Sequence, residues 1–435
     1  MKKKLLYHAC LLACFNTTVA YADCRQQTFD PNYTKPDTNE LFGATICNDK
    51  YGQVIYGGNN VEGLIEQFDQ AQLRQQFPEF NENVDSAFFE GNFRGVPILA
   101  AFPEEHGDRL VFKVPELGIC KEWGNGAPQF CRSSEKSAGN REANKDKLED
   151  YLKKEGDKIL RELVKASAVD PIAGNPSSQQ SQTVADEFNA GTDNQYDVAT
   201  GETMPNRLGI GARFGSYSLG DKSVTAYTLP LSYKVPLSPD QELIFRLPIT
   251  YTTVEGARSY RVATGVSYKK SVTEVWSLAP SISYGMAGSR DLGSAAHSIS
   301  TSLTSNYVLP ISTSKYEVSI GNMVGYYKTL PFKIQDYEVD LDITNVVLRN
   351  GLSLSIPLGK KLVGQELSLE TFVVDTRFTG DELYIDQYQE IGFSIGPKTT
   401  KGKAGFSGQE IGIGFQYLRA EGGNNGFTFN LGYEF

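Results

Sequence analysis

The chain has 435 residues, of which 11% are aromatic and 22% are charged, and its formal net charge is -10 at pH 7. This acidic balance argues against a nucleic-acid partner, because nucleic-acid binding depends on clustered Lys and Arg. The length allows two domains. Beyond the amino-terminal region, no run reaches the ~18 apolar residues that a transmembrane helix needs. If the chain enters a membrane, we expect it to do so with strands.

The first residues carry an export pattern. Lysines at positions 2–4 precede a mostly apolar stretch at 5–15, and Ala20-Tyr21-Ala22 offers a small-x-small cleavage site. We therefore predict a secretory signal peptide at residues 1–22. A lipoprotein signal ending at Cys14 is the alternative, but the short apolar run disfavours it.

Four cysteines follow the predicted cleavage site: Cys24, Cys47, Cys120 and Cys131. An even number in an exported chain indicates disulfides, although four cysteines allow three connectivities. Nearest-neighbour pairing, Cys24 with Cys47 and Cys120 with Cys131, is the simplest. Metal binding is the alternative, but it lacks a Cys-x-x-Cys spacing or a neighbouring His pair. We expect neither a metal nor a cofactor.

Residues 23–134 carry the pattern of a small α+β domain. Strands are predicted at 53–56, 87–93, 96–102 and 109–114, and apolar residues at helical spacing predict a helix over 61–76. We interpret residues 23–134 as a soluble head with two disulfides.

Residues 135–168 are rich in Lys, Glu and Leu, and they predict a helix with a broken apolar stripe. Two interpretations stay open: the helix packs on the head or stands exposed, or it fills a pore. Residues 169–206 begin with a Pro-rich helix breaker and continue without periodicity. We predict a flexible linker there.

From residue 207 to 435 the pattern changes to alternation of apolar and polar residues. Leu208, Ile210, Ala212 and Phe214 begin the first of about twelve such segments, and many Tyr side chains stand near the ends of the apolar rows. Alternation of this kind, with aromatic girdles and an even strand number, is typical of transmembrane β-barrels. The predicted fold class is mainly β, with an antiparallel transmembrane β-barrel of about twelve strands at residues 207–435. A soluble β-sandwich is the alternative.

The last segment repeats the pattern with five large side chains on one face: Phe427, Phe429, Leu431, Tyr433 and Phe435. An aromatic residue at the very end of such a row resembles the closing strand of Gram-negative outer-membrane β-barrels. The resemblance implies that these residues form the insertion signal that the barrel insertion machinery reads. It also implies outer-membrane lipid as a partner and the cell outer membrane as the location.

One segment does not fit a simple strand. Between Tyr337 and Pro357 the apolar parity changes near Asn350-Gly351. A hairpin at Asn-Gly would add a strand, whereas a bulge within one long strand would keep the count even.

The face opposite the apolar rows is rich in Gly and Ser, so the wall is thin and leaves space inside, either for a water-filled channel or for a plug. Charged side chains are also expected on this face: Arg213, Lys234, Arg246, Arg261, Glu338, Asp340 and Asp342. The three acidic residues could bind Ca²⁺ or select cations, but solvated lumen charges are the simpler interpretation.

The order of signal peptide, head, helix and barrel resembles the classical autotransporters, whose helix threads the barrel. The first hypothesis is therefore a non-enzymatic autotransporter-like translocator or display protein. The second is a porin-like pore with a periplasmic head acting as plug or adaptor. Either role implies a cell-surface or a periplasmic protein partner. The cysteines favour a periplasmic head, and the helix favours display.

An outer-membrane hydrolase is disfavoured. His297 next to Ser298 invites the comparison, but adjacent strand residues face opposite ways and cannot form a nucleophile and its base. We expect no catalytic residues.

Overall fold

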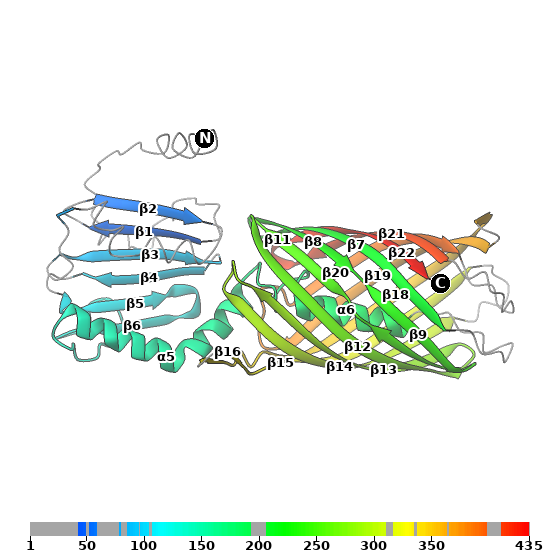
Figure 1. The fold of residues 1–435 in the computed structure, drawn as a ribbon, viewed down its shortest axis with the longest axis horizontal. Helices are drawn as coiled ribbons and strands as arrows, with labels where there is room; N and C mark the ends of the chain where they lie inside the picture. The colour runs from blue at the N-terminus through cyan, green and yellow to red at the C-terminus, as the bar shows by residue number, and fades with distance from the viewer. Residues whose placement is uncertain are drawn as a thin grey trace, which may run out of the picture.

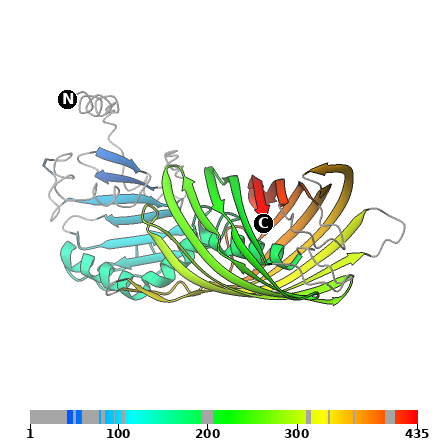
Figure 2. The same ribbon diagram turned by 45° about the vertical axis from the view of Figure 1, so that its right-hand side comes forward.

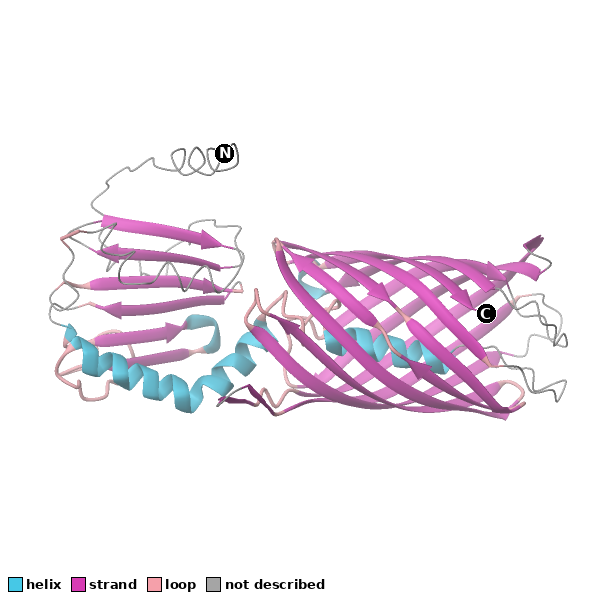
Figure 3. Cartoon of the chain, viewed as in Figure 1, coloured by secondary structure: helices cyan, strands magenta, loops and turns pink. Residues whose placement is uncertain are grey.

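The computed structural model describes residues 42–48, 52–58, 78–79, 85–94, 96–103, 107–192, 206–309, 316–334, 337–362, 365–397 and 410–434. A head domain and a β-barrel lie end to end, and a long helix runs along the head towards the barrel (Figures 1 and 3). The predicted helix over 61–76, the signal peptide and Cys24 lie outside the described residues.

The head contains one antiparallel sheet with the strand order β2-β1-β3-β4-β5-β6. Its strands are β1 (Phe42–Asn48), β2 (Gly52–Gly58), β3 (Ala87–Phe93), β4 (Val96–Phe102), β5 (Leu110–Val114) and β6 (Ile119–Trp123), with a 3-10 turn η2 (Pro115–Leu117). β3 and β4 coincide with two predicted strands. The sequence patterns missed β1 and β6, which form the rest of the sheet with β2 and β5.

Helix α5 (Arg141–Ala166) packs on this sheet. It begins at Asn140, whose side chain accepts a hydrogen bond from the backbone N–H of Ala143 at 2.9 Å. Ile159 and Leu163 are buried against apolar side chains of β4, β5 and β6, including Trp123. The interpretation that the predicted helix at 135–168 packs on the head is therefore correct, and the interpretation that it fills the pore is wrong.

The barrel is a closed antiparallel sheet that begins with β7 and ends with β22, and these two strands pair with each other. Its segments are β7 (Arg207–Leu219), β8 (Lys222–Leu229), β9 (Leu231–Ser238), β10 (Gln241–Arg246), β11 (Ile249–Val254), β12 (Ala257–Thr273), β13 (Trp276–Ser289), β14 (Ser294–Leu309), β15 (Glu317–Leu330), β18 (Thr344–Leu362), β19 (Gln365–Gly380), β20 (Gln387–Pro397), β21 (Glu410–Ala420) and β22 (Asn425–Glu434). A short 3-10 turn, η3 (Glu421–Gly423), joins the last two strands.

Fourteen segments make twelve strands, because two strands are interrupted by proline. β8 and β9 are separated only by Pro230, and β10 and β11 only by Leu247 and Pro248. Proline has no N–H to contribute to the ladder, so the pairing breaks there without ending the strand. The prediction of about twelve antiparallel strands is confirmed.

Side chains alternate between the two faces of the barrel wall as predicted. Outward residues are large and apolar, with exposed fractions of 44% for Val262, 48% for Ile282 and 56% for Ile391. Inward residues are polar and buried, for example Ser281, Ser283 and Ser300. An apolar exterior around a polar interior is the arrangement of an outer-membrane barrel.

The change of parity near Asn350-Gly351 has a different cause from either predicted one. β18 runs unbroken through both residues, and its pairing with β15 and β19 is regular there. The odd apolar residues before it belong instead to a rim segment that contains a hairpin of β16 (Phe332–Ile334) and β17 (Tyr337–Val339) outside the barrel sheet. Strand parity does not apply to that segment.

A buried carboxylate organises the disulfide loop of the head. Cys120 and Cys131 form the predicted disulfide, and Cys47 is also disulfide-bonded. Inside the loop, Glu122 accepts hydrogen bonds of 2.9 to 3.0 Å from three successive backbone N–H groups, the last that of Cys131, and pairs with Arg109. Burial raises the pKa of Glu122, but the three backbone N–H groups and Arg109 lower it by more than burial raises it. The pKa of Glu122 therefore lies below its ordinary value.

We expect Glu122→Gln to destabilise the head by about 3 kcal/mol, because it leaves Arg109 buried without its carboxylate. The depressed pKa of Glu122 stabilises the fold above its ordinary pKa of 4.5. This contribution is lost as the pH falls through the folded pKa, so the difference between wild type and variant should shrink in acid.

Urea unfolding followed by fluorescence measures the effect, with Trp276→Phe as background so that Trp123 reports alone. Glu142→Gln, at a carboxylate whose side chain is 77% exposed, is the control. Equal stability of the two variants at pH 7 would contradict the role of Glu122.

The barrel lumen and its internal helix as the candidate functional site

A second helix, α6 (Gln179–Thr192), lies inside the barrel lumen (Figure 2). Ser178 precedes it, and the Ser178 hydroxyl accepts a hydrogen bond from the backbone N–H of Ser181 at 3.4 Å, as an N-cap does. The buried residues of α6 are mostly polar: Gln179, Gln180, Ser181, Thr183, Val184, Glu187, Phe188 and Gly191. The prediction of a flexible linker over 169–206 is therefore wrong for its described part.

Polar groups of α6 bond to the barrel wall on several sides. Glu187 accepts hydrogen bonds from the hydroxyls of Ser283 at 2.7 Å and Ser300 at 2.5 Å. Asp186 pairs with Arg213 at 3.3 Å. On the opposite side, the Gln180 amide donates to the Asn345 side chain at 2.8 Å. These bonds replace the water that polar side chains of an open lumen would hold.

The wall is also shaped to fit α6. A Cβ atom added at Gly321 or at Gly351 would lie 2.9 Å from the ring of Phe188, too close for an ordinary contact. The Arg349 guanidinium stands 5.1 Å from the centroid of the same ring, in a cation–π arrangement. The thin wall predicted from the Gly and Ser residues thus accommodates a helix side chain.

The end of the lumen next to the head is closed by residues 167–178, here called the mouth segment. Val169, Ile172 and Ala173 are at most 4% exposed and belong to an apolar cluster with rim residues such as Leu292 and Ile385. The backbone of the segment is bonded as well, because Ile385 N–H donates to Gly174 at 3.1 Å. The mouth segment therefore packs across this end of the lumen.

An ion pair joins the head, the mouth segment and the barrel. Arg94, in the turn between β3 and β4, pairs with Asp170, and both side chains are at most 2% exposed. Arg94 also donates to the backbone carbonyls of Leu292 at 2.8 Å and Gly293 at 3.0 Å, in the β13–β14 turn. The Ser294 hydroxyl donates to Asp170 at 3.0 Å. Head and barrel are therefore in direct contact.

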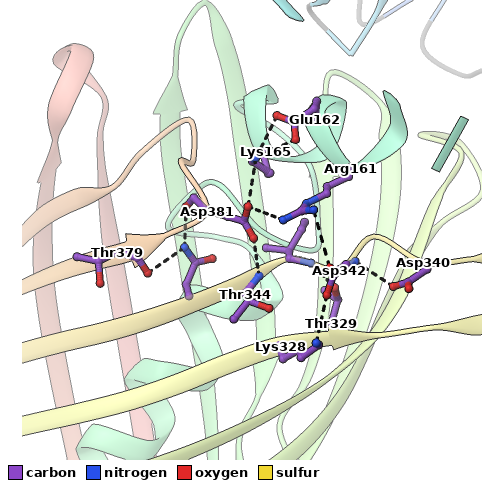
Figure 4. Close-up of polar contacts among 12 residues, drawn as sticks. Arg161, Glu162, Lys165, Lys328, Thr329, Asp340, Asp342, Thr344, Thr379 and Asp381 are labelled. Atoms are coloured by element: carbon purple, nitrogen blue, oxygen red, sulfur yellow. Dashed lines mark hydrogen bonds and ion pairs between the residues drawn. The ribbon is translucent and has the colours of Figure 1, made fainter. Parts of the chain in front are cut away.

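A second set of charges holds the end of α5 to the rim (Figure 4). Arg161 and Lys165 lie 2.6 and 3.4 Å from the carboxylate of Asp381. Burial raises the pKa of Asp381, but a hydrogen bond from the Thr344 N–H and the Arg161 guanidinium lower it, and the net result lies below the ordinary value. Asp381 therefore stays ionised at neutral pH, and these charges attach α5 to the rim.

The predicted lumen charges divide into two groups. Lys234, Arg246 and Arg261 are inward and at most 9% exposed, and Arg213 faces α6. The predicted acidic row does not enter the lumen. Asp340 is exposed, and Asp342 lies at the rim near Arg161 and Lys328. The prediction of an inward acidic row is wrong because the rim segment is not part of the barrel wall. The side chain of Glu338 lies outside the described part of the structure.

The residues of the predicted insertion signal lie in the closing strand β22, except Phe435, which is outside the described residues. Phe427, Phe429 and Leu431 are outward and 43 to 44% exposed, and Tyr433 occupies the next alternate position of β22. The row therefore contributes to the apolar exterior of the barrel.

His297 and Ser298 lie on opposite faces of β14. The His297 ring contacts the Tyr284 hydroxyl at 2.7 Å on the outer wall, whereas Ser298 is buried in the lumen next to Gln179. They do not form a nucleophile and base. Within the described ranges, His, Cys, Asp and Glu residues do not gather into a metal site. No described helix has both the length and the apolar composition that crossing a membrane requires.

Neither a protein-family model nor a curated protein matches the sequence. Solved structures similar to the chain include the translocator domain of the autotransporter NalP from Neisseria meningitidis (13% identity, TM-score 0.41, 59% of this chain and 94% of that one). Another is the β domain of the Bordetella autotransporter BrkA (13% identity, TM-score 0.40, 54% of this chain and 99% of that one). LpxR from Salmonella typhimurium is also similar (12% identity, TM-score 0.36, 52% of this chain and 99% of that one). The chain forms a closed twelve-strand barrel of outer-membrane type, resembling an autotransporter translocator.

We expect the double variant Gly321→Leu/Gly351→Leu to displace α6, because both new side chains would occupy the volume of the Phe188 ring. Conductance across a planar bilayer should rise, and the barrel should unfold at lower temperature. Gly432→Leu is the matched control, since a Cβ there meets nothing within 4 Å. A double variant that conducts and unfolds like the control would show that Phe188 does not fill this space.

Proposed function

We propose that the protein is a non-enzymatic outer-membrane anchor that displays its small head domain at the cell surface, with α6 filling the barrel. The observation that supports this proposal is the path of the chain through the barrel. From the head it passes the mouth segment, runs through the lumen as α6, and begins β7 at the far end of the barrel.

The two ends of the barrel support this orientation. With an even number of strands, β7 begins and β22 ends on the same side, and the head lies at the other end (Figure 1). In outer-membrane barrels with an even strand number that shared side is periplasmic, which leaves the head outside. The path then matches the autotransporter resemblance of the sequence, with α6 rather than α5 as the helix in the pore.

The way in which the head is held favours display over release. The buried pair of Arg94 and Asp170 and the pairs of Asp381 with Arg161 and Lys165 connect it to the rim. Removing one partner of a buried pair costs about 3–5 kcal/mol. A head meant for secretion would not need such contacts.

A second candidate is a pore protein whose head lies in the periplasm as a plug or adaptor. It is favoured by the disulfide of the head, because Cys120 and Cys131 are bonded and a head that folds and oxidises in the periplasm would be too wide for the lumen. Connector lengths do not separate the two orientations: the 13 residues between β15 and β18 lie at the head end, and the 12 residues between β20 and β21 join strands that meet at the other end. In this orientation the mouth segment would close the periplasmic opening.

Protease access to the head on intact cells distinguishes the two. A cleavage site inserted at Gly126, in the exposed stretch 125–129 of the disulfide loop, should be cut from outside if the head is displayed. A site at Pro239, in the turn between β9 and β10 at the far end, should be cut only after the outer membrane is permeabilised. The reverse pattern would establish the periplasmic head and refute display.

A further inference from the structure

Three arginines stand together on one wall of the lumen, and here they are called the arginine cluster: Arg213 of β7, Arg246 of β10 and Arg261 of β12. Arg213 and Arg261 lie in one cross-strand row, because Arg213 pairs with Thr228, Thr228 with Thr250, and Thr250 with Arg261. The Arg261 guanidinium donates to the Thr250 hydroxyl at 2.7 Å.

Arg246 belongs to the neighbouring part of the same wall. It pairs in register with Gly265, four positions along β12 from Arg261 on the same face. A Cβ atom at Gly265 would lie 2.9 Å from Nη2 of Arg246. The glycine therefore gives the guanidinium its place against the wall.

The cluster faces α6, which supplies fewer charges than it needs. Asp186 lies 3.3 Å from Arg213 and interacts electrostatically with both Arg246 and Arg261. Glu187, the other acidic residue of α6, also interacts with Arg246, but its carboxylate oxygen is held by two serine hydroxyls. Among the residues that the structure describes, three guanidinium groups thus face two carboxylates, which leaves an excess of one positive charge. Such a charge away from bulk water is costly unless an anion accompanies it.

Two of the three arginines also have unsatisfied hydrogen-bond donors. Nε and Nη1 of Arg246 and the same two atoms of Arg261 have no hydrogen-bond partner among the described residues. The two residues are only 9% and 4% exposed. Nε and Nη1 of one guanidinium point to different edges, so an oxyanion placed between the two residues would accept charge-assisted hydrogen bonds from one edge of each arginine.

We propose that the lumen holds a binding site for a small oxyanion, of the phosphate or carboxylate class, between Arg246 and Arg261 beside α6. The anion accepts hydrogen bonds from the free N–H groups and neutralises the excess charge. Arg213 stays paired with Asp186 and adds its positive charge to the electrostatic potential at the site. The site does not depend on the side of the membrane on which the head lies.

Equilibrium dialysis of the full-length protein in detergent with radiolabelled inorganic phosphate, at constant ionic strength with chloride, tests the site. We expect saturable binding of about one phosphate per chain, because one anion compensates the excess charge. Arg246→Gln/Arg261→Gln should weaken binding by at least about tenfold, since charge-assisted hydrogen bonds are lost. The control is Arg258→Gln/Arg419→Gln, at two arginines exposed on the outer wall, which should bind like wild type.

Asp186→Asn gives a change of opposite sign, because it removes the carboxylate that competes with the anion for the cluster. Phosphate should bind several-fold more tightly to this variant than to wild type, a result that loss of packing cannot produce. If the double arginine variant does not fold, Arg261→Gln replaces it. No saturable binding by wild type, unchanged binding by the arginine variant, or no tightening by Asp186→Asn would each overturn the proposal.

Discussion

The constraint on which the structure depends is a polar lumen that has to be filled. Closing twelve strands turns half of their side chains inward, and the apolar half is committed to lipid. The inward half cannot form an ordinary core. A polar helix solves this: Glu187 bonds to two serines, Asp186 pairs with Arg213, and Phe188 fits against two glycines. The helix thus takes the place of water and supplies part of the counter-charge.

The mouth next to the head is apolar, and its cluster continues into the lumen as far as Val184 and Phe188 of α6. At the mouth, Val169, Ile172 and Ala173 are packed against rim residues and form an apolar cluster of the kind found in soluble domains. This cluster surrounds the buried pair of Arg94 and Asp170, whose remaining polar atoms bond to Leu292, Gly293 and Ser294. Apolar packing excludes water, and the ion pair fixes the geometry. Together they connect a water-soluble sheet to a membrane barrel without a flexible joint.

The sequence predicts the barrel well because its signal is repeated. Alternation in about twelve segments identifies the wall, the lumen face of Arg246 and Arg261, and the closing strand. It does not identify α6, because an amphipathic stripe marks a helix only when the partner surface is apolar. The partner surface of Gln179–Thr192 is itself polar. Two signals for a helix were available in the sequence: Ser178 as an N-cap residue, and the apolar pair Val184 and Phe188 four positions apart. The rim segment before Thr344 was predicted wrongly for a related reason. Its apolar residues Leu341 and Ile343 pack at the mouth and do not belong to a strand of the barrel sheet.

The position of α6 also restricts the order of assembly. The head lies at one end of the barrel and the start of β7 at the other, so α6 cannot enter a closed barrel unless one of these parts passes through the lumen. A folded six-stranded sheet with α5 is wider than a lumen that one helix fills, since a helix with its side chains measures about 10–12 Å across. Either the head crosses unfolded, or β22 pairs with β7 around a helix that is already in place. The second route brings the wall into contact with α6 as the ring closes, so the glycines at 321 and 351 pack on Phe188 and the serines bond to Glu187 from the start.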